Sequence, residues 1–246
     1  MDIFELIVVI IACASLPLMI WMVFQSISVR TTYARYNSTN SRSGMTSQEA
    51  ARRILDINGL FDVKIGKCSG MLTDHYDPRN NTVYLSASTL NSSSIAAIAV
   101  AAHEVGHAIQ HAEGYAPIKL RGALVPVVNI MSNMITPFLI LGIVFEFIAI
   151  AGTNISIYFY FGALICYALY ALFTFVTLPC EYNASSRAKT QLVECDILTQ
   201  EEVNTASKVL SSAAKTYLIS FFISLAQVAR ILLMVLSVRG RNNNNK

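Results

Sequence analysis

Long apolar stretches alternate with polar ones along the 246-residue chain, and several are long enough to cross a bilayer. The first covers residues 3–24. Two more, separated only by the short segment 152–154, occupy 122–178, and a last one covers 217–238. The pattern predicts an N-terminal transmembrane helix, a transmembrane hairpin and a C-terminal transmembrane helix, with a disordered Asn-rich tail over 239–246.

Prolines and polar residues predict where the two spans of the hairpin begin and end. Pro126 and Pro137 indicate an entry portion near the interface before a span over 135–151. The second span is expected over 155–178, because the residue before a proline, here Pro179, favours the end of a helix.

The polar stretch 25–118 has the mixed pattern of a small α/β region. A capping box at 46–49 predicts the start of a helix. Short strands are expected over 62–65 and 82–86, with the turn-rich segment 74–81 between them. If the strand over 82–86 lies at an edge of the sheet, an extended substrate can pair with it.

Two further helices are expected close to the membrane segments. Serines 92–94 can cap a helix over 95–113, and Gly114 can end it. The polar segment 179–215, which follows the hairpin, is also expected to be helical.

Composition agrees with a membrane protein. The chain is 54% hydrophobic and 13% charged, whereas soluble domains carry about 25% charged residues. The net charge of +3 is too small to indicate a nucleic-acid partner. The five cysteines show no paired spacing, which favours small apolar filler in a reducing compartment over disulfides.

The distribution of lysine and arginine predicts the orientation in the membrane. Ten of these residues lie between Arg30 and Arg121 and four between Arg187 and Lys215, which places both polar regions in the cytoplasm and the N-terminus outside. The basic residues after 238 would then lie outside, against the rule. Either the tail breaks the rule or the last apolar stretch does not cross; a fourth span is the favoured interpretation.

The motif His103-Glu104-Val105-Gly106-His107 lies in the helix predicted over 95–113. Two histidines four residues apart leave one face of a helix and can bind one metal ion, and a glutamate beside the first can act on water, as in zinc hydrolases. A third histidine, His111, lies about 12 Å of helical rise from His103. It is too distant to share the ion and is expected to support the site or lie at the surface.

Zinc in a catalytic site needs a third protein ligand. The hairpin returns the chain to the side of the membrane that it left, and Glu181 is among the first residues that it delivers. On position alone, a ligand role for Glu181 is about as well supported as that of a solvated carboxylate near a helix start, where the helix dipole favours it.

Three separated motifs carry a family resemblance: Leu72–Arg79, His103–His111 and Pro179–Ser185. With them the chain resembles the YugP-like family of membrane zinc metallopeptidases and, more distantly, is similar to the HtpX-type and CAAX-processing membrane metallopeptidases. The resemblance covers nearly the whole chain. It implies a zinc ion bound by His103, His107 and Glu181, with Glu104 as the general base.

The chain departs from these patterns at two positions. Asn183 stands where the family tends to have Asp, and Ser185 stands where the HtpX-type pattern has Asp. Either side chain can form a hydrogen bond with a ligating imidazole, but neither polarises it as a carboxylate would.

The expected fold is a mainly α membrane protein with a small zincin-like α/β region around the motif helix. The expected function is that of a membrane-bound zinc endopeptidase acting on a protein or peptide substrate, with its active site on the cytoplasmic side of a multi-pass integral membrane protein. The alternatives are a catalytically inactive metal-binding scaffold and a site-2-type intramembrane protease. Candidates for stabilising the oxyanion are His75, Tyr76 and Tyr182.

Overall fold

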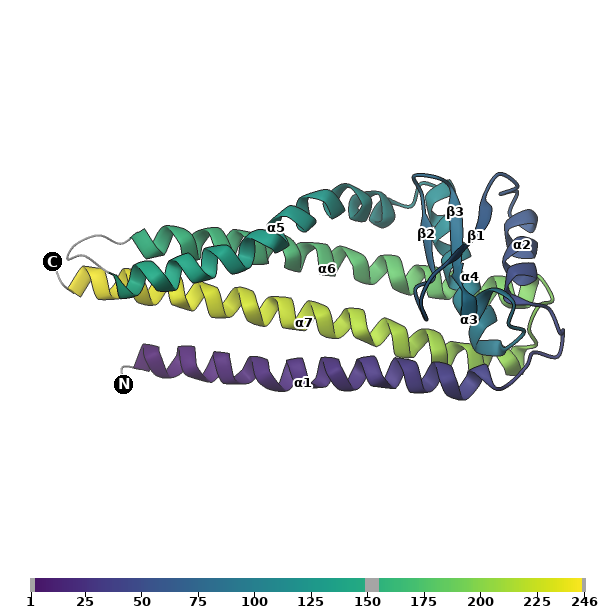
Figure 1. Ribbon diagram of the computed structural model, residues 1–246, viewed down its shortest axis with the longest axis horizontal. Coiled ribbons are helices and arrows are strands. Elements are labelled where there is room, and N and C mark those ends of the chain that lie inside the picture. The colour runs from purple at the N-terminus through teal and green to yellow at the C-terminus, as the bar shows by residue number, and fades with distance from the viewer. Residues whose placement is uncertain (1–2, 149–154, 245–246) are drawn as a thin grey trace. The chain divides into compact units, whose positions relative to one another are not determined.

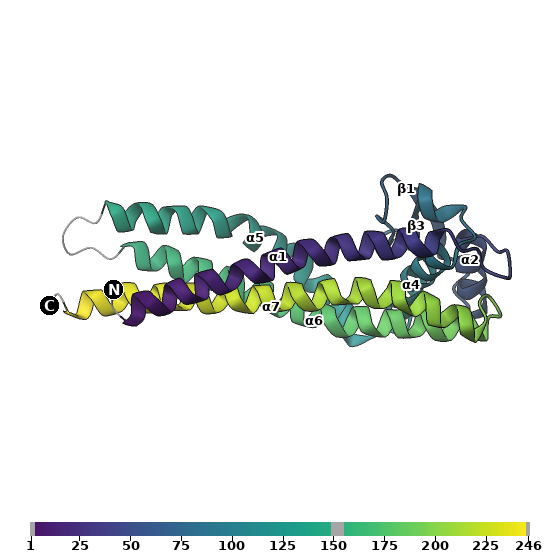
Figure 2. The same ribbon diagram turned by 90° about the horizontal axis from the view of Figure 1, so that it is seen from below.

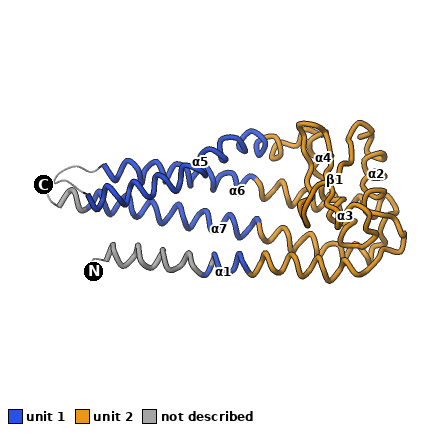
Figure 3. Tube along the Cα trace, in the orientation of Figure 1, with its two compact units in different colours: residues 1–23, 120–176, 217–246 blue, residues 24–119, 177–216 orange. Residues whose placement is uncertain are grey.

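The computed structural model describes residues 3–148 and 155–244, and the chain divides into two compact units (Figure 3). Unit 1 comprises residues 1–23, 120–176 and 217–246, and unit 2 comprises residues 24–119 and 177–216. The predicted connector over 152–154 lies outside the described residues.

Long helices account for most of the chain: α1 (Ile3–Asn37), α5 (Ala116–Phe147), α6 (Ile155–Glu194) and α7 (Gln200–Asn244). Among the described residues, α5, α6 and α7 are long and apolar enough to cross a membrane. The N-terminal span predicted over 3–24 falls within the longer α1, and its membrane crossing stays a prediction.

The helix end predicted at Pro179 is wrong, because α6 continues through this proline to Glu194. The helix α5 is continuous through Pro126 and Pro137, and an entry portion near the interface stays a prediction. A proline inside a helix removes one backbone hydrogen bond. In α6 the turns that follow Pro179 are held by buried side chains, including Ala184, Ala188 and Leu192, so the helix persists. Packing therefore overrides the local preference that the proline signals.

The C-terminal part differs from the prediction as well. The helical segment predicted over 179–215 consists of the end of α6, a turn, and the start of α7. The tail predicted to be disordered over 239–246 is helical as far as Asn244, where α7 ends; residues 245–246 lie outside the described residues.

In unit 1, α5 and α6 run alongside one another (Figure 2). The ring of Phe159 stacks on that of Phe145 with centroids 5.2 Å apart. Between α6 and α7, the hydroxyls of Thr174 and Ser224 lie 3.1 Å apart. A polar contact of this kind inside apolar helices fixes how their faces meet.

Unit 2 contains a three-stranded sheet with helices beside it (Figure 1). Its smaller elements are α2 (Ser47–Ile57), β1 (Lys64–Cys68), β2 (His75–Asp77), β3 (Thr82–Ser86), α3 (Ala87–Leu90) and α4 (Ile95–Ala112). The strand order is β1-β3-β2, with β1 parallel and β2 antiparallel to β3. The helix α4 packs against α2, β2 and β3.

The position of β3 corrects the expectation about the sheet edge. The strand covers the predicted residues 82–86 but lies at the centre of the sheet, not at an edge. The segment predicted as turns contributes β2, which pairs Tyr76 with Val83. A three-residue strand has no alternation to read in the sequence, and it exists here because β3 lies beside it. The edge strand that packs against α4 is therefore β2.

Caps fix the starts of the helices in unit 2. Thr46 and Glu49 form the predicted capping box of α2, and the Ser94 hydroxyl accepts a hydrogen bond from the Ala97 amide at the start of α4. Gly114, just after α4, has a φ of +69°, a conformation that glycine adopts without strain. Buried side chains of α2, β3 and α4 form one core with those of α6 and α7 from 188 to 210.

Candidate metal centre

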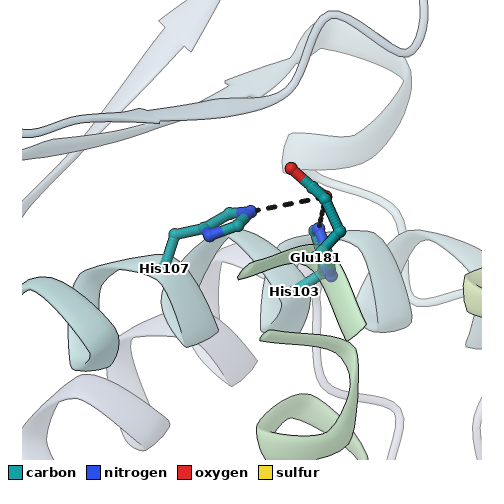
Figure 4. Close-up of side chains that lie close together, drawn as sticks. All are labelled: His103, His107 and Glu181. Atoms are coloured by element: carbon teal, nitrogen blue, oxygen red, sulfur yellow. Dashed lines mark hydrogen bonds and ion pairs between the residues drawn. The ribbon is translucent and has the colours of Figure 1, made fainter. Parts of the chain in front are cut away.

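His103, His107 and Glu181 bring their side chains together in unit 2 (Figure 4). One ligand atom from each lies within 4.8 Å of the others. Oε2 of Glu181 lies 3.2 Å from Nε2 of His103 and 3.7 Å from Nε2 of His107. Two of these groups come from neighbouring turns of α4, and the third comes from α6, two residues after Pro179.

A glycine lets α6 approach α4 closely enough to deliver Glu181. A Cβ atom added to Gly106 would lie 2.7 Å from the carbonyl oxygen of Ala184 and 3.3 Å from its Cα. Both are backbone atoms, so the helix would have to move as a whole. Gly106 occupies one of the variable positions of the zinc-hydrolase motif, and the sequence alone gave no sign of this role.

The imidazole of His107 contacts Gln110, one turn further along α4, through the nitrogen that does not face Glu181. Nδ1 of His107 lies 3.0 Å from Oε1 of Gln110. Nε2 of Gln110 donates to the carbonyl oxygen of Cys180 at 2.8 Å and to Oδ1 of Asn183 at 2.9 Å. Gln110 is fully buried and was not among the predicted site residues. A glutamine on a helix carries no signal of this kind until its partners on α6 are known.

The imidazole of His103 contacts the side chain of Ser185. Its hydroxyl oxygen lies 3.1 Å from Nδ1 of His103, so one of the two side chains predicted to contact an imidazole does so. Asn183 instead accepts hydrogen bonds from Gln110 and from Nε of Arg187.

Glu104, the predicted base, is buried between α4 and β2. Its Oε2 accepts a hydrogen bond of 3.1 Å from the backbone amide of Tyr76. Burial raises the pKa of Glu104, and the nearby His103 and His107 oppose that rise. A carboxylate with a raised pKa is a better proton acceptor near neutral pH than an exposed one.

The charges of the cluster favour a cation. Burial alone would raise the pKa of Glu181, which follows the apolar part of α6, but its hydrogen bonds with His103 and His107 outweigh burial and lower it. For His107, burial lowers the pKa, but the contacts with Cys180 and Glu181 raise it to about 10. A buried carboxylate therefore draws positive charge toward the two Nε2 atoms. Two imidazole nitrogens and one carboxylate oxygen are a donor set that fits zinc.

His111 does not belong to the cluster, as predicted. Its Nδ1 lies 3.3 Å from the hydroxyl of Tyr76, which itself donates to Oδ1 of Asn81 at 2.9 Å. The exposed His75 stacks on Tyr84 with ring centroids 5.0 Å apart.

Tyr182, the remaining oxyanion candidate, is next to Glu181 on α6 and 48% exposed. An oxyanion role for His75, Tyr76 or Tyr182 stays a prediction.

Comparison with known proteins adds the family. The model of a family described as "Putative neutral zinc metallopeptidase" matches residues 9–236. This chain belongs to that family. It is also 40% identical over 235 residues to "Putative membrane protease YugP" of Bacillus subtilis (strain 168), a match that covers 95% of this chain and 99% of the relative. No solved structure matches the chain. The family resemblance expected from the three motifs is confirmed.

Proposed function

We propose that this chain is a membrane-bound zinc endopeptidase, with His103, His107 and Glu181 as the zinc ligands and Glu104 as the general base. The observation that supports it best is the convergence of two Nε2 atoms on one buried carboxylate oxygen. Glu104, buried on the same helix as the histidines, supports hydrolysis over a purely structural metal site. Family membership and the relative named a membrane protease point to the same class.

In the proposed reaction Glu104 transfers a proton from the attacking water to the leaving amine. A bound zinc ion would supply the Lewis acidity that lowers the pKa of water toward about 7. Glu104 accepts the proton of the water that attacks the peptide carbonyl, and it passes this proton to the leaving amine as the C–N bond breaks. The Tyr76 amide, bound to Oε2 of Glu104, holds the carboxylate in place for both transfers.

The site is proposed to face the cytoplasm of a multi-pass integral membrane protein. Support comes from the basic residues concentrated before 121 and between 187 and 215, together with three described helices of spanning length. The motif helix α4 is not among those three. It packs against a sheet and α2, which favours a site outside the bilayer over a site-2-type intramembrane one.

Replacing Glu104 with Gln tests the base directly. Purified Glu104→Gln protein should bind zinc as the wild type does, while peptide hydrolysis falls by at least about 100-fold, the lower end of what a positioned acid–base group contributes. Metal content is measured by elemental analysis and hydrolysis with an unstructured protein substrate.

His111→Gln is the matched control, because His111 lies on the same helix outside the cluster. It should keep both zinc and hydrolysis. Hydrolysis that survives in Glu104→Gln would refute the base, and a wild type that binds zinc but cleaves nothing would favour the inactive scaffold. Membrane proteins with cytosolic segments that accumulate in cells carrying Glu104→Gln would support the proposed sidedness.

A further inference from the structure

We propose that Gln110 is a positioning residue that fixes the tautomer of His107 and ties it to the helical turn that carries Glu181. The proposal rests on the metal centre proposed above. It adds a residue outside the ligand set, and it follows from which atoms can donate and which can only accept a hydrogen bond.

The orientation of the Gln110 amide is determined by two independent acceptors. One is the backbone carbonyl of Cys180, which can only accept, at 2.8 Å. The other is Asn183, whose Oδ1 must be an oxygen because Nε of Arg187, which can only donate, lies 2.8 Å from it. Both partners require a donor from Gln110, so the amide nitrogen faces α6.

The amide oxygen therefore faces His107. An amide oxygen cannot donate, so the hydrogen of the 3.0 Å contact must be on Nδ1 of His107. Nε2, which faces Glu181, is then the nitrogen whose lone pair is available to a metal once any second proton has left. Gln110 thereby selects the ligating nitrogen of His107.

The same contacts couple the two parts of the ligand set. The Cys180 carbonyl belongs to the residue just before Glu181, and Gln110 lies three residues after His107. One buried side chain thus connects the turns that carry a ligand on α4 and a ligand on α6. Ser185 does not do the same for His103, because a hydroxyl can either donate or accept and does not dictate the tautomer.

The experiment measures zinc affinity of the full-length protein in detergent, by competition with a chromophoric chelator. Gln110→Leu keeps the approximate volume and removes every side-chain hydrogen bond of Gln110. Zinc affinity should fall roughly 10- to 100-fold, as for other residues that orient a metal ligand. Gln110→Glu keeps an acceptor for His107 and should fall between wild type and Gln110→Leu. The control Asn183→Ala removes only one of the two acceptors on α6 and should lose much less.

A second readout is the 15N spectrum of the His107 ring. Zinc-loaded wild type should carry its hydrogen on Nδ1 and bind zinc through Nε2, whereas zinc-loaded, folded Gln110→Leu should show a mixture of rings that bind zinc through Nε2 and through Nδ1. If Gln110→Leu fails to fold, the wild-type spectrum and Gln110→Glu still decide the question.

Three results would overturn the proposal: unchanged affinity in Gln110→Leu, zinc bound through Nδ1 in wild type, or an equal loss in Asn183→Ala, which would indicate general packing. A wild type that binds no zinc would instead contradict the proposed metal centre.

Discussion

The helix α4 and the part of α6 that follows Pro179 contribute to the same cluster in different ways. Two imidazoles and the candidate base come from five consecutive residues of α4, a helix that is buried over most of its length. From α6 come one carboxylate, the Ser185 hydroxyl and the carbonyl of Cys180. Reactive groups can therefore be local in sequence, while the charge and orientation that make them one site come from a second helix.

The two helices also differ in what holds them to each other. On α4 the approach depends on the absence of a side chain at Gly106, whereas on α6 it depends on the backbone around Ala184. The comparison can be tested by changing the charge that α6 supplies, the contact surface between the helices, and the support that each histidine receives.

The largest expected effect is that of pH on zinc affinity. Below the pKa of about 10 that His107 has in the metal-free cluster, zinc must displace one proton. Zinc affinity should therefore fall about tenfold per pH unit, or roughly 100-fold from pH 8 to pH 6. Chelator competition across this range measures the slope. In Glu181→Gln, which removes the charge supplied by α6, affinity should drop and the slope should flatten; an equally steep slope would contradict the coupling.

The raised pKa of His107 also makes the folding stability of the metal-free protein depend on pH. The pKa of His107 is raised from 6.5, so its contribution to folding stability is complete below about 6.5 and is lost as pH rises toward about 10. Thermal unfolding of metal-free protein should therefore show this part of its stability declining with rising pH, and the decline should be absent from Glu181→Gln.

A smaller effect, on folding stability and zinc binding, is expected from a substitution at the contact between α4 and α6. Gly106→Ala should lower the free energy of unfolding by about 1–3 kcal/mol, the usual cost of overpacking, and weaken zinc binding because α6 must move with Glu181. Gly122→Ala is the matched control, since a Cβ at this helical position meets nothing within 4 Å. The control should be neutral or slightly stabilising. Denaturant titration measures both, and equal effects would contradict the close approach.

The smallest effect is expected at Ser185. Ser185→Ala removes the hydroxyl beside His103 but leaves the remaining contacts of the cluster. Zinc affinity should fall by less than about tenfold, the lower end of the range for residues that orient a ligand. The same chelator competition provides the measurement. A loss larger than that of Gln110→Leu would reverse the proposed ranking of the two supports.

Several features of unit 2 follow from local sequence patterns. Thr46 and Glu49 predict the start of α2, and Ser94 predicts the start of α4. The spacing of His103 and His107 places both on one face of α4. Each of these features depends on residues no more than four positions apart, which is about one turn of helix. The same locality explains the error at Pro179, because this residue favours a helix end and the buried side chains of the following turns override that preference.

Residues far apart in sequence met only in the tertiary structure. Glu181 is 78 positions from His103, and sequence position alone left it open between a ligand and a solvated carboxylate. No pattern in neighbouring residues predicts the hydrogen-bond partners of Gln110, the contact of Gly106 with Ala184 or the pairing of β2. By itself the sequence determined which helix bears the reactive groups, since helical periodicity is a property of consecutive residues. Only the packing of α6 on α4 decided which carboxylate faces them, because that choice depends on how two surfaces fit.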